Sequence, residues 1–166
     1  MEDNIQDPVQ DNAPQEGLFD DHVEYTPASK GSRFLNWLID NLFMSYVLGY
    51  ATGYLVGYLL SIIAPDFLMS IAFGEDKSVD YYLFVFILSL FNYFIYYTIC
   101  EKAFNGYTLG KAITGTKAIR EDGQPITFKD TLYRTLSRMV PFEAFSGFGD
   151  RPWHDSWTKT TVIKAR

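Results

Sequence analysis

Apolar residues gather in two long uncharged runs, which dominate the pattern of the chain. The first run covers residues 42–63, and the second covers residues 81–100. At a rise of about 1.5 Å per residue, a helix over either run is about 30 Å long, which matches the hydrocarbon core of a bilayer. The pattern therefore predicts two membrane-spanning helices, over about residues 34–63 and 81–103.

Three glycines recur at every fourth position of the first span, and a tyrosine follows each one. Steps of four place Gly49, Gly53 and Gly57 in one row along a helix. Such a row lets another helix backbone approach closely, which is a common mode of association between membrane helices. Two hypotheses follow. The row packs against the second span, which we favour because that partner is tethered, or against a second copy of the chain in an oligomer.

The polar segments outside the spans differ in charge. Residues 1–32 hold eight of the 20 acidic residues and show no hydrophobic period, which predicts a disordered acidic N-terminal tail. Eleven of the 14 lysines and arginines follow the second span, and only Lys77 lies between the spans. Because cytoplasmic segments collect basic residues, we expect both termini in the cytoplasm and residues 66–80 outside.

Residues 104–166 predict a cytoplasmic or interfacial segment with short elements of its own. Residues 116–120, a turn at Asp122-Gly123, and residues 125–127 are typical of a small β-hairpin. Residues 160–164 also have a strand pattern and could join this hairpin.

An amphipathic helix is expected over about residues 128–140, because Thr127 and Asp130 have the spacing of a capping box. Its basic residues suit the headgroup region of an anionic leaflet. The predicted fold class is therefore an all-α membrane protein: a two-span transmembrane hairpin with a cytoplasmic amphipathic helix and a small β-hairpin.

Few residues suit catalysis or metal binding. Cys100 is the only cysteine, which excludes an intramolecular disulfide and a cysteine-based zinc site. The two histidines, His22 and His154, are far apart in sequence. Residues 106–111 contain Gly-Lys but lack the spacing of a phosphate-binding loop, so we expect Lys111 in a turn against lipid headgroups. We expect no catalytic residue, no metal, no cofactor and no nucleic-acid partner.

Several motifs are weak individually, but their order and spacing along the chain are specific: RFLNWLID from residue 33, GYTLGK from residue 106, Arg134, and Trp153-His154-Asp155. Together they make residues 33–164 resemble the RDD family of small bacterial membrane proteins, which is named for one arginine and two aspartates. Many relatives have a third span before the His-Asp motif, whereas residues 142–150 are too short to cross a bilayer. The resemblance implies one membrane domain over residues 33–164 in the inner membrane of a bacterial cell.

The resemblance also implies a polar centre made of Arg33, Asp40 and Asp155. An ionisable side chain near the start of a membrane helix is costly, so we expect a basic partner for Asp40. For Asp155 we expect His154 or a backbone amide as partner. The polar centre either handles ions or clamps the C-terminal segment to the first helix. The candidate supporting residues are Asn36, Lys111, Arg134, Arg138 and His154.

The family resemblance favours a transport or cation/proton-handling component, since such activities are attributed to some members. Two helices cannot enclose a pathway, so this hypothesis requires a homo-oligomer or other membrane proteins as partners within the bilayer. The alternative is a non-transporting accessory, scaffold or assembly subunit, in which the arginine and aspartates are structural. Enzymatic activity is not expected.

Overall fold

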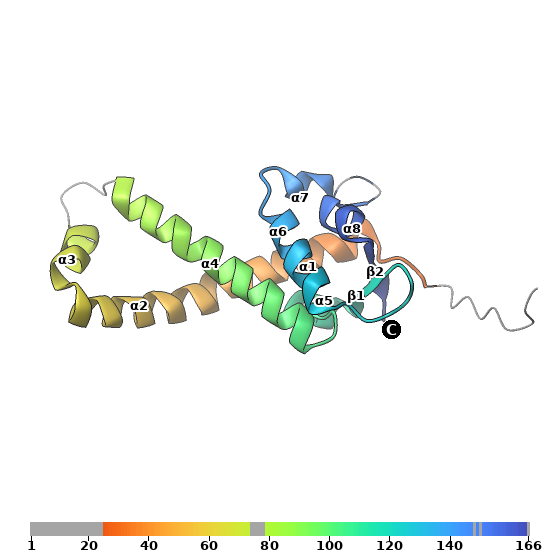
Figure 1. Cartoon of the computed structure of the whole chain (residues 1–166), viewed down its shortest axis with the longest axis horizontal. Helices are drawn as coiled ribbons and strands as arrows, with labels where there is room; N and C mark the ends of the chain where they lie inside the picture. Colours follow the sequence, from red (N-terminus) through yellow and green to blue (C-terminus); the bar gives the residue numbers. More distant parts are fainter. Residues whose placement is uncertain (1–24, 74–78, 148, 150, 166) are drawn as a thin grey trace, which may run out of the picture.

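The computed structural model describes residues 25–73, 79–147, 149 and 151–165. The first 24 residues of the expected acidic tail lie outside the described residues. In the described part, helices predominate, and one small sheet accompanies them (Figure 1).

The first span is a continuous helix of 34 residues, from Lys30 to Ile63. It consists of α1 (Lys30–Phe43), a π-helical turn η1 (Met44–Leu48) and α2 (Gly49–Ile63). Ser29 caps its start, because its side chain accepts a hydrogen bond from the amide of Ser32 at 3.1 Å. Ala64 ends it, since the residue before a proline disfavours the α conformation.

The short helix α3 (Pro65–Phe73) turns the chain, and the second span follows as α4 (Val79–Ala103). Figure 1 shows α2, α3 and α4 outlining an open triangle at one end of the molecule. The most apolar stretch of the first span is unburied, and that of the second is only 22% buried, whereas a core helix of a soluble protein is mostly buried. These surfaces need apolar surroundings, so the two predicted membrane-spanning helices are confirmed as candidates by length, composition and exposure.

The remaining elements gather around α1 and the end of α4, at the other end of the molecule (Figure 1). We call residues 104–165 the cap. Its elements are α5 (Leu109–Thr114), β1 (Thr116–Arg120), α6 (Phe128–Arg138), α7 (Glu143–Ser146), α8 (Trp153–Thr158) and β2 (Thr160–Lys164). The predicted amphipathic helix is α6, and the predicted capping box of Thr127 and Asp130 is present.

The predicted small antiparallel sheet is confirmed, but its two strands are far apart in the sequence. β1 pairs with β2 from Thr116↔Lys164 to Arg120↔Thr160. The expected second arm of the hairpin, residues 125–127, is wrong: Pro125 makes only an isolated bridge to Ile119. Proline lacks an amide to donate, and Thr127 is committed to the cap of α6.

The expected boundary of the tail at residue 32 is also wrong. Residues 26–28 run along the free edge of β2, where Ala28 N donates to Val162 O at 2.8 Å and Lys164 N donates to Thr26 O at 2.9 Å. Ala28 also joins Ala118, Ile126 and Val162 in a small buried core. The edge of the sheet therefore anchors the chain directly before α1.

The two spans touch near the middle and then diverge. Asn92 Nδ2 donates to Thr52 Oγ1 at 2.7 Å, which confirms the interpretation of Asn92 as an interhelical hydrogen-bonding residue. Beyond this contact, a Cβ atom added at Gly53 or Gly57 would meet nothing within 4 Å, and one at Gly49 would meet only its own helix. The favoured hypothesis that the glycine row packs against α4 is therefore wrong.

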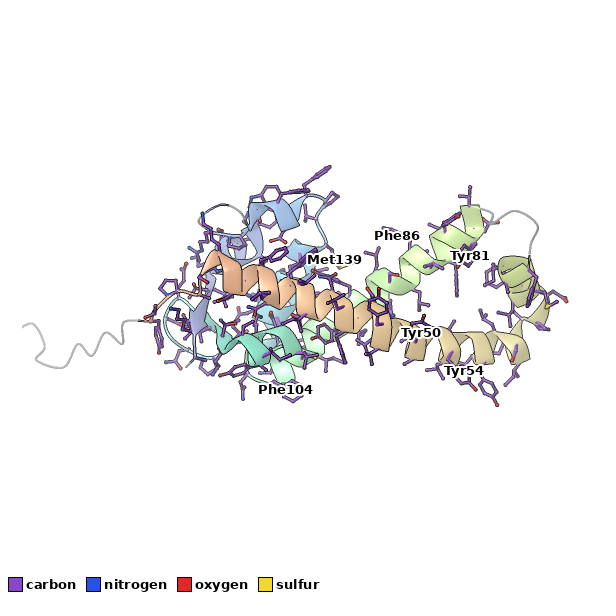
Figure 2. The ribbon with its side chains drawn as sticks, turned by 180° about the vertical axis from the view of Figure 1, so that it is seen from behind. Tyr50, Tyr54, Tyr81, Phe86, Phe104 and Met139 are labelled. Atoms are coloured by element: carbon purple, nitrogen blue, oxygen red, sulfur yellow. The ribbon has the colours of Figure 1, made fainter. Side chains whose placement is uncertain are left out.

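The tyrosines beside this row are exposed as well; Tyr54 is 82% exposed and lies on the part of α2 that is separated from α4 (Figure 2). Packing of the row against a second copy of the chain stays a prediction. A different glycine makes the close approach inside the molecule. A Cβ atom at Gly110 in α5 would lie 2.8 Å from Asn36 Cα, which belongs to the backbone of α1.

Gly53 and Gly110 should respond in opposite ways to substitution by alanine. Gly110→Ala should lower the unfolding temperature in detergent, because its methyl group collides with the backbone of α1. Gly53→Ala is the matched control and should leave that temperature unchanged or raise it, since alanine stabilises a helix by about 0.5–1 kcal/mol over glycine.

Equal destabilisation by both substitutions would contradict this arrangement of the helices. Loss of cross-linked dimers in Gly53→Leu, with an unchanged unfolding temperature, would support the oligomer hypothesis for the row.

Candidate functional site

Three carboxylates from three different elements are buried where the cap meets the spans. Asp40 lies in α1, Glu101 near the end of α4, and Asp155 in α8. Buried charges are costly unless hydrogen bonds or opposite charges compensate the lost hydration. We call these three carboxylates and the side chains bonded to them the polar centre.

Hydrogen-bond donors, rather than a basic residue, surround Asp40. Its Oδ1 accepts from Tyr96 Oη and from the amide of Gly110, and its Oδ2 accepts from Thr108 Oγ1, each at 2.7 Å. Thr108 is also the N-cap of α5, so the carboxylate faces the first turn of that helix. The expected basic partner is wrong, because among the described residues no cation forms an ion pair with Asp40. Three donors compensate its burial and fasten α5 to α1.

Glu101 is the centre of the charge network. Its Oε1 pairs with Lys111 Nζ and with Arg138 Nη2, the latter at 2.8 Å, while its Oε2 pairs with Arg134 Nε at 3.0 Å. The sequence analysis did not single out Glu101. The sequence does carry a signal for Glu101: it is the first charged residue after the uncharged run of the second span, where a carboxylate needs a partner.

Lys111 does not face lipid headgroups, so that expectation is wrong; only 3% of this residue is exposed. Lys111 follows Gly110 in α5. Its side chain points into the cap, where its Nζ pairs with Glu101. Burial lowers the pKa of Lys111 to about 8, against the opposing effect of Glu101. The side chain is therefore still an ammonium ion at pH 7.

Asp155 joins the cap to the start of the first span. Its Oδ1 accepts from Arg134 Nη1 at 2.6 Å, and its Oδ2 lies 3.4 Å from Arg33 Nη1. The expected partner His154 is present at 3.5 Å but is not the main one. Burial alone would raise the pKa of Asp155, but Arg134 and the other positive groups beside it lower that pKa to about 2.

The other predicted residues support these contacts. Asn36 binds Thr114 and, at 2.9 Å, Thr116, which holds α1 against the α5–β1 junction. The guanidinium group of Arg138 also lies 4.6 Å from the centre of the Tyr97 ring, a cation–π distance.

His154 lies between Asp155 and Glu143, and its closer contact is with Glu143. Its Nδ1 lies 2.5 Å from Glu143 Oε1. Burial is the main cause that lowers the pKa of His154, so the imidazole is neutral at pH 7. Burial would raise the pKa of Glu143, but the contact with His154 lowers it.

A cavity of about 220 Å³ lies within the polar centre, and Arg33, Asp40, Arg138, His154 and Asp155 are among its lining residues. Among the described residues, no three His, Cys, Asp or Glu side chains are grouped so that they could hold a metal ion. The glycine row on α2 is not part of this site. The chemistry that the polar centre offers is therefore charge pairing and hydrogen bonding between elements.

Removing the central carboxylate should unfold the junction between the cap and the spans. Glu101→Gln leaves Lys111 and Arg138 without their counter-charge and Arg134 with Asp155 alone, and we expect a loss of about 3–5 kcal/mol in unfolding free energy. Glu121→Gln is the control, because Glu121 pairs with Arg151 at the surface and its side chain is 45% exposed. That change should cost less than about 1 kcal/mol in detergent unfolding. Similar losses in both variants would contradict the central place of Glu101.

Acidification should weaken the cap in two stages. The folded protein holds the pKa of His154 below its usual 6.5, so the unfolded chain binds more protons below pH 6.5, and stability falls as the pH drops through that window. Asp155 has a folded pKa of about 2 against an ordinary 3.8, so its contribution is present above pH 4 and is lost toward pH 2. Unfolding temperatures between pH 7.5 and pH 2 measure both stages.

His154→Gln should flatten the upper stage and leave the lower one in place. A wild-type protein that became more stable between pH 7 and pH 5 would refute this assignment.

Comparison with known proteins places this site in a family. The model of the RDD family matches residues 27–159, which include Arg33, Asp40, Glu101, Arg134 and Asp155. No curated protein and no solved structure matches the chain. The RDD family consists of membrane proteins and is not known for enzymes. Because the match covers most of the chain, this protein belongs to the RDD family.

Proposed function

We propose that this protein is a non-transporting accessory or assembly subunit of the membrane, in which the polar centre clamps the cap onto the two spans. One observation carries this proposal: each of the three carboxylates of the polar centre is compensated by groups from other elements of the same chain. Asp40 binds α4 and α5, Glu101 binds α5 and α6, and Asp155 binds α6 and α1. This arrangement is what a structural clamp requires.

The spans themselves support the same function. Asp40 and Glu101 both lie at the cap end, and no charged residue occurs within residues 42–63 or 81–100. Ion pathways through a membrane need polar or ionisable groups along their length. Between the two uncharged runs, residues 42–63 and 81–100, the polar link is the bond between Asn92 and Thr52.

Cation/proton handling in an oligomer is the second candidate. The cavity beside Asp40 favours it, because Asp40, Tyr93 and His154 all line that space. Partner subunits would have to complete the pathway through the bilayer.

Reconstitution separates the two candidates. Purified wild-type protein in sealed vesicles with a pH gradient should add no Na⁺- or K⁺-dependent proton flux over empty vesicles, measured with a pH-sensitive dye. Asp40→Asn should speed protease cleavage around α5, within residues 104–116, because its amide nitrogen meets hydroxyl and amide donors where an acceptor is needed. Asp66→Asn, at an exposed position in α3, should behave like the wild type.

Cation-dependent flux in the wild type that Asp40→Asn abolishes, with unchanged protease resistance, would replace the accessory function with ion handling.

We also propose that both termini are cytoplasmic, with the protein in the bacterial inner membrane, since the basic residues follow the second span. Asp76→Cys and Asp122→Cys, each in a Cys100→Ser background, should react with an impermeant maleimide from opposite sides of the membrane. In intact cells stripped of their outer membrane, only the cysteine at position 76 should label. Labelling of both from outside would refute the two-span topology.

A further inference from the structure

A second, apolar groove adjoins the polar cavity. It has a volume of about 570 Å³ and lies between the start of α1 and the chain around α7 and α8. Phe34, Trp37 and Phe145 are its large apolar lining residues. Arg33, Trp37, Glu143, Pro152 and His154 line both spaces. A polar pocket and an apolar groove thus share one wall.

Buried nitrogen atoms beside this wall have no hydrogen-bond acceptor among the described residues. They are Nε of Arg33 and Nη1 of Arg138; a third such atom, Nη2 of Arg134, belongs to a residue that lines neither space. Arg33 and Arg138 both line the polar cavity, and the side chain of Arg138 is only 7% exposed. A buried donor without an acceptor destabilises the folded protein, and does so more when it is charged. An oxyanion in the cavity would provide the missing acceptors, and guanidinium groups bind phosphate oxygens especially well.

The charges around the cavity limit the number of negative charges that the bound anion can carry. Its cationic lining residues are Arg33, Lys111 and Arg138, and its carboxylates are Asp40, Glu143 and Asp155. Glu101 already neutralises part of the charge of Lys111 and Arg138, and His154 is uncharged at pH 7. This balance favours a phosphodiester with a single negative charge over a phosphate monoester with nearly two.

The depth of the groove in a bilayer indicates where this phosphodiester comes from. Trp37 and Arg33 precede the uncharged run of the first span by about 8 and 13 Å of helix rise. The headgroup region extends about 5–8 Å beyond the hydrocarbon core, so Trp37 lies at its level, and the long side chain of Arg33 is one that reaches back toward it. Phe34 is 51% exposed and Trp37 is 43% exposed in the groove, and aromatic side chains are favoured at this depth.

We propose that the cavity binds the phosphodiester of an anionic phospholipid, with the headgroup in the groove over Phe34 and Trp37 and the acyl chains directed along α1 toward the hydrocarbon core. The site goes beyond the accessory function, because it makes the attachment of the cap depend on the lipid composition of the leaflet. Bound lipid oxygens accept from Arg33 and Arg138, and the acyl chain covers apolar surface of α1.

The test uses the purified full chain in detergent, with the unfolding temperature and native mass spectrometry as readouts. Phosphatidylglycerol should raise the unfolding temperature and bind as one molecule per chain. Phosphatidylcholine with the same acyl chains should raise it less, because its headgroup has no net charge. Inorganic phosphate should have no effect, because it cannot fill the groove.

Two neighbouring exposed residues on α1 provide a matched pair of variants. Phe34→Glu places a carboxylate in the groove and should abolish the rise caused by phosphatidylglycerol. Leu35 is 48% exposed but does not line the groove, so Leu35→Glu should retain the rise. Arg33→Lys keeps the positive charge beside Asp155 but removes the Nε donor, and should weaken lipid binding about tenfold.

Equal effects of phosphatidylglycerol and phosphatidylcholine would overturn the proposal, since they indicate a general effect of lipid. Equal loss in Phe34→Glu and Leu35→Glu would overturn it for the same reason. A rise caused equally by inorganic phosphate would also overturn it, by assigning the cavity to a free anion. If Phe34→Glu does not fold, unchanged lipid affinity in Arg33→Lys overturns the proposal by itself.

Discussion

The attachment of the cap depends on Arg134, which lies fully buried between two carboxylates. It pairs with Glu101 at the end of the second span and with Asp155 in α8. Each ion would be costly to bury alone, so each is stable only while the others stay in place. Apolar packing at this end is divided between two small clusters: Ala28, Ala118, Ile126 and Val162 beside the sheet, and Met44, Tyr96 and Tyr97 between the spans. Charge pairing therefore sets where the cap lies relative to the spans, which explains why these residue types occur so close to the membrane.

Local sequence signals predicted what local physics determines. Uncharged runs identified both spans, because burial of charge in hydrocarbon excludes almost any alternative. The spacing of Thr127 and Asp130 identified the start of α6, since a capping box involves only neighbouring residues. Asn92 was correctly interpreted as an interhelical group for a similar reason: an amide inside a membrane helix needs a partner on another helix.

The partners of the polar residues could not be predicted, because they depend on how distant elements cross. Helical periodicity places Asp40 on a face of α1, but only the approach of α5 shows that Gly110 and Thr108, rather than a cation, meet it. The predicted strand partner of β1 was wrong for a similar reason. The turn at residues 122–123 favours a local hairpin, yet the nonlocal strand β2 offers a complete row of amides and pairs along all of β1. The predicted packing of the glycine row against α4 was wrong because the spans diverge beyond Thr52. The sequence of one helix does not reveal this divergence.

The two ends of the molecule are held together by different interactions, and this difference bears on function. At the cap end, buried ion pairs and hydrogen bonds link α1, α4, α5, α6 and α8. At the far end, α2 and α4 separate and expose apolar side chains (Figure 2). Regions with few internal contacts have low local stability, so the surroundings decide their arrangement. The bilayer and neighbouring helices therefore determine the geometry of the open end, while the polar centre keeps the cap in register with the spans. A rigid end beside an adaptable one is the arrangement that the proposed accessory function requires.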